Sequence, residues 1–210
     1  MLASPERKKS LALKASEMAA NVGAVQSYLD TRGISEPVAA HYKLGSTTEF
    51  GSLRLSIPYF TPAGVVDIKY RCALTEHGDH KDKSIHCSKM MKESGCGSHL
   101  YNAQSLIRAS DLVVVTEGEL DAVMVEGYTG FPTVGYPGTS NWEKRWRYCF
   151  DGIGEVIVIA DGDDPGRKAA EHVAQAIGTA ARVVDLGDGH DASSYIRDLG
   201  VSQFVERLSR

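Results

Sequence analysis

The chain has 210 residues, a hydrophobic content of 42%, a charged content of 24% and a formal net charge of −4 at pH 7. These values are ordinary for a soluble globular protein, and they allow one compact unit of two lobes. No segment is apolar enough for a signal peptide or a membrane span, and the four cysteines lack paired CxxC spacing. We therefore expect a cytoplasmic protein with reduced thiols and without a membrane partner.

The first 44 residues predict helices. Residues 1–22 form either a charged amphipathic helix or a loosely held arm, and a solvated tail explains the pattern equally well. Residues 24–44 predict two short helices, of which Gly33 ends the first and Ser35 caps the second. Such a pair could be a DNA-binding helix-turn-helix, but its second helix is not basic, and helix pairs of this length are common packing units.

An antiparallel meander is predicted next. Apolar residues alternate with polar ones over 53–59 and again over 66–72, with a Thr-Pro-Ala-Gly turn between the two strands. Lys69 and Arg71 then project from the same face of the second strand. Residues 75–98 are polar and rich in Lys, His and Gly, which predicts a long loop that becomes ordered on binding.

From residue 111 the pattern changes to alternating strands and helices. Apolar runs that predict buried strands occupy 112–115, 132–134, 155–160 and 182–186. Helical segments lie near 120–126, 142–150, 165–177 and 192–199. This alternation predicts an α/β fold with a parallel sheet flanked by helices, preceded by a small α+β lobe. The expected domains are an arm or helix over 1–22, the lobe over 23–110, and the sheet domain with its carboxy-terminal helices over 111–210.

Two acidic motifs follow two of the predicted strands. Glu-Gly-Glu-Leu-Asp occupies 117–121, and Asp-Gly-Asp-Asp-Pro-Gly occupies 161–166. The carboxyl ends of parallel strands lie at one edge of the sheet, where α/β proteins bind ligands. Repulsion among carboxylates gathered there would be large unless Mg²⁺ or Mn²⁺ neutralised it. The motifs therefore predict a divalent-metal site suited to phosphoryl or nucleotidyl transfer.

Within these motifs the residues have different expected tasks. Asp164 is expected to cap the helix that begins at Pro165, which leaves Asp161 and Asp163 to direct their carboxylates toward one ion. Asp121 lies one helical turn from Glu117, which itself is a candidate proton acceptor for a hydroxyl nucleophile. The alternative is that the aspartates only keep a loop soluble, and the pairing of the two motifs argues against it.

The two motifs, in this order and on these strands, resemble the signatures of the Toprim domain. Within that superfamily the chain is most similar to the catalytic cores of bacterial primases and to the primase part of phage primase-helicases. Three further stretches carry the resemblance. They are the meander over 57–71, the Gly-Tyr-Pro-Gly-Thr-Ser loop over 135–140, and a third acidic element over 189–192. The resemblance runs from about residue 23 to residue 208.

The resemblance implies roles for individual residues. The catalytic set would be Glu117, Asp121, Asp161 and Asp163. The metal ligands, for two Mg²⁺ or Mn²⁺ ions, would be Glu117, Asp161, Asp163 and Asp191. Lys69 and Arg71 fall where primases place cations against template or nucleotide phosphates, and Lys81 and Lys83 are weaker candidates for the same task. The alternative is that Lys69 and Arg71 are ordinary exposed strand residues without a binding role.

The implied function is that of a DNA primase catalytic core, a nucleotidyltransferase that makes short RNA primers on single-stranded DNA from ribonucleoside triphosphates. A separate replicative helicase is the expected protein partner, and a phage-encoded protein would act in the cytoplasm of its bacterial host. The sequence has neither the paired CxxC motifs of a zinc ribbon nor a helicase phosphate-binding loop. His86, Cys87, Cys96 and His99 could hold zinc, but their spacing is poor and we expect none. The alternatives are a Toprim nuclease and a non-catalytic helicase-binding module.

Overall fold

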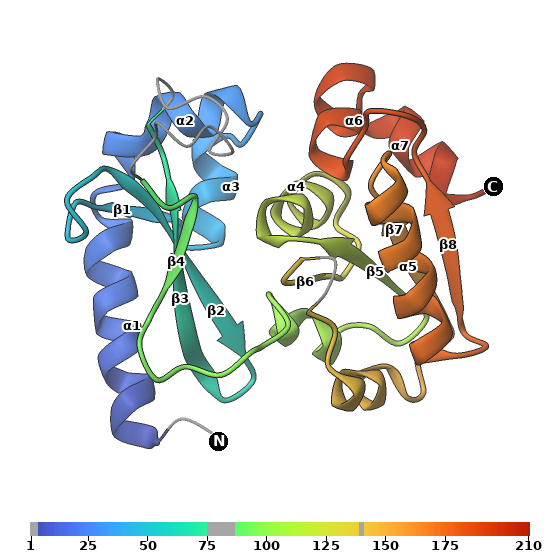
Figure 1. The fold of residues 1–210 in the computed structure, drawn as a ribbon, viewed down its shortest axis with the longest axis horizontal. Helices are drawn as coiled ribbons and strands as arrows, with labels where there is room; N and C mark the ends of the chain where they lie inside the picture. Colours follow the sequence, from blue (N-terminus) through green and yellow to red (C-terminus); the bar gives the residue numbers. More distant parts are fainter. Residues whose placement is uncertain (1–3, 75–86, 139–140) are drawn as a thin grey trace. The chain divides into compact units, whose positions relative to one another are not determined.

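The computed structural model describes residues 4–74, 87–138 and 141–210 (Figure 1). The chain divides into two compact units, Met1–Ser98 and His99–Arg210. Each unit is built around its own four-stranded sheet. The first sheet is antiparallel and the second is parallel, as the two sequence patterns predicted.

The first sheet has the strand order β1-β2-β3-β4. Its strands are β1 (Gly45–Thr47), β2 (Arg54–Thr61), β3 (Gly64–Cys72) and β4 (Met90–Lys92). The β2–β3 hairpin is the predicted meander. β4 corrects the prediction of a loop over 75–98, because Met90–Lys92 pairs with β3 and sets Lys92 directly opposite Lys69. Residues 75–86 of that predicted loop lie outside the described residues.

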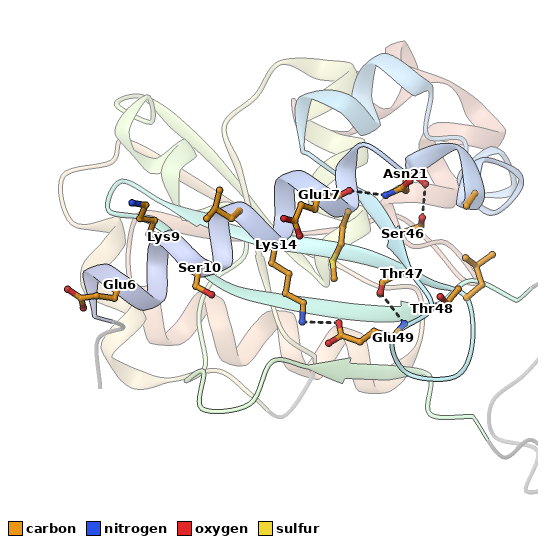
Figure 2. A pocket seen from close by; sticks show the side chains of 14 residues that line it. Glu6, Lys9, Ser10, Lys14, Glu17, Asn21, Ser46, Thr47, Thr48 and Glu49 are labelled. Atoms are coloured by element: carbon orange, nitrogen blue, oxygen red, sulfur yellow. Dashed lines mark hydrogen bonds and ion pairs between the residues drawn. The ribbon is translucent and has the colours of Figure 1, made fainter.

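The amino-terminal segment is a helix, α1 (Pro5–Ala19), and not an arm or a solvated tail. Ser4 caps it by accepting a hydrogen bond from the Arg7 backbone N–H at 3.2 Å. The helix buries one apolar face against β3, through Leu11, Ala15 and Met18. A groove of about 1020 Å³ lies along α1 and β1, and the side chains that line it are drawn in Figure 2. None of the predicted site residues lines the described part of this groove.

The predicted helix pair is confirmed. A 3-10 turn, η1 (Val22–Val25), leads into α2 (Gln26–Thr31), and α3 (Glu36–His41) follows after Gly33, whose φ is +73°. A side chain would be strained at that φ, so glycine ends the first helix there. The pair buries Leu29, Ile34 and Ala39, which favours its interpretation as a packing unit.

The second sheet has the strand order β6-β5-β7-β8, and all its strands are parallel. The strands are β5 (Leu112–Glu117), β6 (Thr133–Tyr136), β7 (Glu155–Ala160) and β8 (Ala181–Asp185). The helices are α4 (Glu119–Thr129), α5 (Asp164–Ile177), α6 (Ala192–Leu199) and α7 (Val201–Leu208). Short 3-10 helices, η3 (Ala103–Ile107) and η4 (Lys144–Phe150), complete the unit, and η4 replaces the longer helix predicted over 142–150.

The sheet of the second unit is covered on both faces, which explains why the central strands β5 and β7 are apolar over most of their length. Val113, Val115 and Val158 belong to a core cluster with side chains of α5 and η4. α4 contributes no side chain to that cluster, and it contacts β5, β6 and α6 instead. Within the described ranges, every helix is too short or too polar to cross a lipid bilayer.

Candidate active site

The strand order of the second unit creates a topological switch point in the sheet. The chain leaves β5 for β6 on one side and returns to β7 on the other, so the direction of the connections reverses between β5 and β7. Ligands of open α/β sheets bind at the carboxyl ends of the two strands that flank such a point. Glu117 is the last residue of β5, and Asp161 directly follows β7.

The five predicted acidic residues lie within electrostatic range of one another at this edge of the sheet. Burial is the main cause that raises the pKa of Asp161, and the carboxylates of Asp121, Glu117, Asp191 and Asp163 raise it further, to about 8. Both burial and nearby negative charge disfavour the ionised form of a carboxyl group. The structure thus brings together side chains from three segments that are separate in the sequence.

The first acidic motif turns sharply after β5 because of two glycines. Gly118 has a φ of +94°, a conformation that L side chains rarely adopt, and its N–H donates to the Tyr136 carbonyl oxygen at 2.8 Å. A Cβ at Gly135, on the neighbouring strand, would collide with the Gly118 carbonyl oxygen. The close approach of the two backbones lets α4 begin at Glu119, directly after Gly118. Asp121 therefore lies in the first turn of that helix.

The second acidic motif is bonded to the loop that precedes α6. The Gly162 N–H donates to the His190 carbonyl oxygen at 2.8 Å, and the Gly189 N–H donates to the Gly162 carbonyl oxygen at 3.1 Å. A Cβ at Gly162 would collide with the Gly187 carbonyl oxygen, so only glycine permits this contact. The two loops therefore hold Asp191 near Asp161.

The structure corrects the expected cap of α5. Asp163, and not Asp164, caps the helix, since its Oδ1 accepts a hydrogen bond from the Gly166 N–H at 2.7 Å. Asp164 is the first helical residue, and 87% of its side chain is exposed. The cap uses one oxygen of Asp163 and fixes the direction of that carboxylate. A residue expected only to bind metal thus also stabilises the helix, by about 1 kcal/mol for a typical cap.

Two serines that the sequence analysis missed hold the other carboxylates. Asp121 Oδ1 accepts hydrogen bonds from the Ser193 N–H at 2.9 Å and from Ser193 Oγ at 2.6 Å. Asp191 caps α6 by accepting from the Ser194 N–H at 2.7 Å, while Ser194 Oγ accepts from the Asp191 N–H. The spacing of Asp191 and Ser194 is that of a capping box and could have been found in the sequence.

These residues fit a divalent cation. Their carboxylate oxygens are the hard ligands that Mg²⁺ and Mn²⁺ prefer, and the raised pKa of Asp161 reports the repulsion that a cation would relieve. Across residues 4–74, 87–138 and 141–210, no three Asp, Glu, His or Cys side chains are already close enough to enclose an ion. Mutual repulsion opposes such closure, and a bound cation would favour it.

Tyr136 is a further polar residue at this point that the sequence analysis assigned only to a loop. It ends β6, directly opposite Glu117 in the parallel ladder, and its side chain is 1% exposed. Its hydroxyl has no hydrogen-bond partner among the described residues. Burial raises the pKa of Tyr136, and the carboxylates of Glu117, Asp161 and Asp121 raise it further. The phenol is therefore a neutral donor facing acidic groups.

The predicted phosphate-binding cations lie in the first unit. Lys69 is opposite Lys92 across the β3–β4 ladder, and Arg71 follows on the same face of β3. Lys69, Arg71 and Lys92 form a basic stripe, and like charges directly opposite each other cost stability. Lys69 Nζ lies 5.0 Å from the centroid of the Tyr59 ring, and the Asp67 carboxylate interacts with both lysines, which offsets part of this cost. Burial raises the pKa of the adjacent Asp67 to about 6, although the two lysines limit the rise. Lys81 and Lys83 lie outside the described residues.

Several known proteins are similar to this chain, although no family model matches it. The Gene 57 protein of Mycobacterium phage D29 is 38% identical over 120 residues, which cover 57% of this chain and 78% of that protein. A DNA primase of Pseudomonas putida is 29% identical over 117 residues, or 53% of this chain and 18% of the primase. The chain thus spans under a fifth of that bacterial primase.

Solved primase structures share the fold of the whole chain. The DnaG catalytic core superposes with a TM-score of 0.76 at 19% identity, over 96% of this chain and 79% of that one. The primase fragment of the bacteriophage T7 primase-helicase superposes with a TM-score of 0.69 at 24% identity, over 86% of this chain and 73% of that one. This chain belongs to the family of Toprim-type primase cores. The predicted α/β fold, with its parallel sheet and antiparallel meander, is thereby confirmed.

Two aromatic side chains of this primase core, Tyr70 and Trp146, are buried and therefore cannot stack on a base. Tyr70 is 0% exposed and Trp146 is 4% exposed. Trp142 packs against Tyr136, Trp146 and Phe150.

The four predicted zinc-ligand candidates do not form one group among the described residues. Cys87 contacts Ser52 and Arg54, whereas Cys96 interacts with Arg7 and Asp67. His86 lies outside the described residues.

Proposed function

We propose that this chain is the catalytic core of a DNA primase, which makes short RNA primers on single-stranded DNA from ribonucleoside triphosphates. The observation that carries the proposal is the gathering of the acidic side chains Glu117, Asp121, Asp161, Asp163 and Asp191 at the switch point of a sheet with the primase-core fold. The reaction would be nucleotidyl transfer, with attack of a 3′ hydroxyl on the α-phosphorus of the incoming nucleotide and loss of pyrophosphate.

Glu117, Asp161, Asp163 and Asp191 would hold one or two Mg²⁺ or Mn²⁺ ions. When bound, the cations supply positive charge to the triphosphate and to the attacking oxygen. Glu117 lies closest to the end of β5 and would accept the proton of the 3′ hydroxyl. The two hydrogen bonds from Ser193 would hold the Asp121 carboxylate in its position beside Glu117.

The basic stripe would bind phosphates. Lys69, Arg71 and Lys92 present three cations on one face of two paired strands, an arrangement that suits a nucleotide triphosphate or the backbone of a single-stranded template. Lys81 and Lys83 remain sequence-based candidates for the same task. Tyr70 and Trp146 are buried and would not stack on template bases.

The partners follow from the same comparisons. One similar solved structure is a DnaG primase catalytic domain bound to single-stranded DNA, and another is part of a primase-helicase of phage T7. We propose that this chain also binds single-stranded DNA and works with a separate replicative helicase. With a phage protein among its relatives, the site of action would be the cytoplasm of a bacterial host.

The test is incorporation of labelled ribonucleotides on random single-stranded DNA with Mn²⁺ or Mg²⁺, with and without a cognate helicase. Primer synthesis supports the proposal. Degradation of DNA in the absence of nucleotides would favour a Toprim nuclease, which would use the same carboxylates with water as the nucleophile. Folded, metal-binding protein that binds the helicase but incorporates no nucleotide on any template would favour a non-catalytic module and would overturn the proposal.

A further inference from the structure

A buried arginine and two cysteines meet at one end of the first sheet. Arg54 begins β2 directly opposite Cys72, the last residue of β3. The Cys72 N–H donates to the Lys89 carbonyl oxygen at 3.0 Å, which brings the chain just before β4 alongside both strands. Arg54 Nη2 donates to Cys87 Sγ at 3.3 Å, and Arg54 Nη1 donates to the Ser88 carbonyl oxygen at 2.9 Å.

The arginine requires a negative partner. Its guanidinium is always charged, and the residue is only 2% exposed. A buried charge is costly unless it is paired. Within the described part of the chain, no acidic side chain forms an ion pair with Arg54, and its Nε has no hydrogen-bond partner. Among the described residues, the guanidinium contacts Cys87 Sγ, and a thiolate at this position would offset the buried charge.

The two thiols differ in a way that suits consecutive reactions. Cys87 is partly exposed, whereas Cys72 is 4% exposed and lies within hydrogen-bonding reach of Cys87. Burial alone would raise the pKa of Cys87, but interactions with Ser52, Cys72 and Arg54 outweigh it and lower that pKa. Burial raises the pKa of Cys72. A reactive outer thiolate therefore lies next to a shielded inner thiol.

We propose that Cys87 and Cys72 form a redox-active dithiol that reacts with small-molecule disulfides. The Cys87 thiolate attacks one sulfur of the external disulfide, whose S–S bond breaks and releases one thiolate that takes a proton from water. Cys72 loses its thiol proton to water and attacks Cys87 Sγ, which expels the second thiolate. One external disulfide is thereby reduced to two thiols, and the two cysteines are oxidised to one disulfide.

Alkylation of the full chain by limiting iodoacetamide, followed by peptide mass analysis, tests the first half of the proposal. Cys149 is the matched control. The residue as a whole is exposed, although partial desolvation of its thiol raises the pKa. Exposure alone predicts faster reaction of Cys149, whereas thiolate character predicts faster reaction of Cys87. We expect Cys87 to react at least about tenfold faster. Equal rates, or faster modification of Cys149, would overturn the proposal.

Treatment with glutathione disulfide tests the second half. We expect wild-type protein and Cys149→Ser to lose the mass of two hydrogens and gain no glutathione, while Cys72→Ser retains one glutathione on Cys87. A stable glutathione adduct on Cys87 in wild-type protein would show that Cys72 does not resolve it, and would refute the dithiol. Arg54→Met should slow Cys87 alkylation about tenfold or more. If that variant does not fold, Ser52→Ala, which removes a weaker contact to Cys87, should slow it less but measurably.

Discussion

Because the pKa of Asp161 is raised, we expect the metal-free protein to lose stability as the pH rises. The pKa of Asp161 is about 8 in the folded protein, whereas the ordinary pKa of an aspartate is 3.8. Between these values the folded protein binds a proton that the unfolded chain has lost, so the free energy of unfolding falls as pH rises. About four pKa units, at about 1.4 kcal/mol each, amount to about 5 kcal/mol lost by pH 8 in the absence of divalent cations.

Asp161→Asn keeps the size of the side chain and removes its charge. We expect the metal-free variant to be more stable than wild type at pH 8 by up to about 5 kcal/mol, and the difference to shrink toward pH 5. Urea unfolding in the presence of a chelator, at several pH values from 5 to 8.5, measures it. Asp67 and His99 also make the free energy of unfolding depend on pH, because burial raises the pKa of Asp67 to about 6 and lowers the pKa of His99. Both contributions are the same in the variant and in wild type, so they cancel in the difference.

Millimolar Mn²⁺ provides the second half of this experiment. It should raise the melting temperature of wild type, because the ion binds only the folded state, and it should not raise that of Asp161→Asn or of Asp161→Ala with Asp163→Ala. Asp164→Asn is the matched control, since Asp164 is exposed in the same turn and should show neither effect beyond about 1 kcal/mol. The reasoning fails if wild-type stability does not fall between pH 6 and 8, or if Mn²⁺ stabilises the double variant equally.

Three further changes separate the roles of the other residues. Glu117→Gln should abolish nucleotide incorporation and leave DNA binding largely intact, and it should reduce Mn²⁺-induced stabilisation without abolishing it, since Asp161, Asp163 and Asp191 remain as ligands. Loss of DNA binding in filter assays would contradict the role of Glu117 as a proton acceptor. Lys69→Ala with Arg71→Ala should weaken single-stranded DNA binding and flatten the slope of log K against log salt by about 1.4; an unchanged slope argues against phosphate contacts. Tyr136→Phe keeps the buried ring, so melting temperature should stay nearly constant while incorporation falls about tenfold, the effect of one lost hydrogen bond to a charged group. If Tyr136→Phe incorporates nucleotides at the wild-type rate, the Tyr136 hydroxyl has no role in the reaction.

Local sequence patterns determined where the strands of the second unit lie and which residues follow them. Apolar runs bounded by glycine predicted β5 and β7 closely, because a strand buried on both faces must be apolar along its length. The same rule placed Glu117 and Asp161 at strand ends. Chemistry alone then indicated a cation, since clustered carboxylates require one.

Other features depended on contacts between segments far apart in the chain. Asp163 and Asp164 are equally good caps by residue type, and only the path of the turn selects Asp163. β4 has three residues and no readable alternation, so its pairing with β3 decides that it is a strand. Ser193 reaches Asp121, 72 residues away, and Tyr136 faces Glu117, because the strand order places them together. Arg54, Cys72 and Cys87 meet for the same reason. A sequence pattern reports which face of an element is apolar, whereas the tertiary structure decides which polar side chains become neighbours.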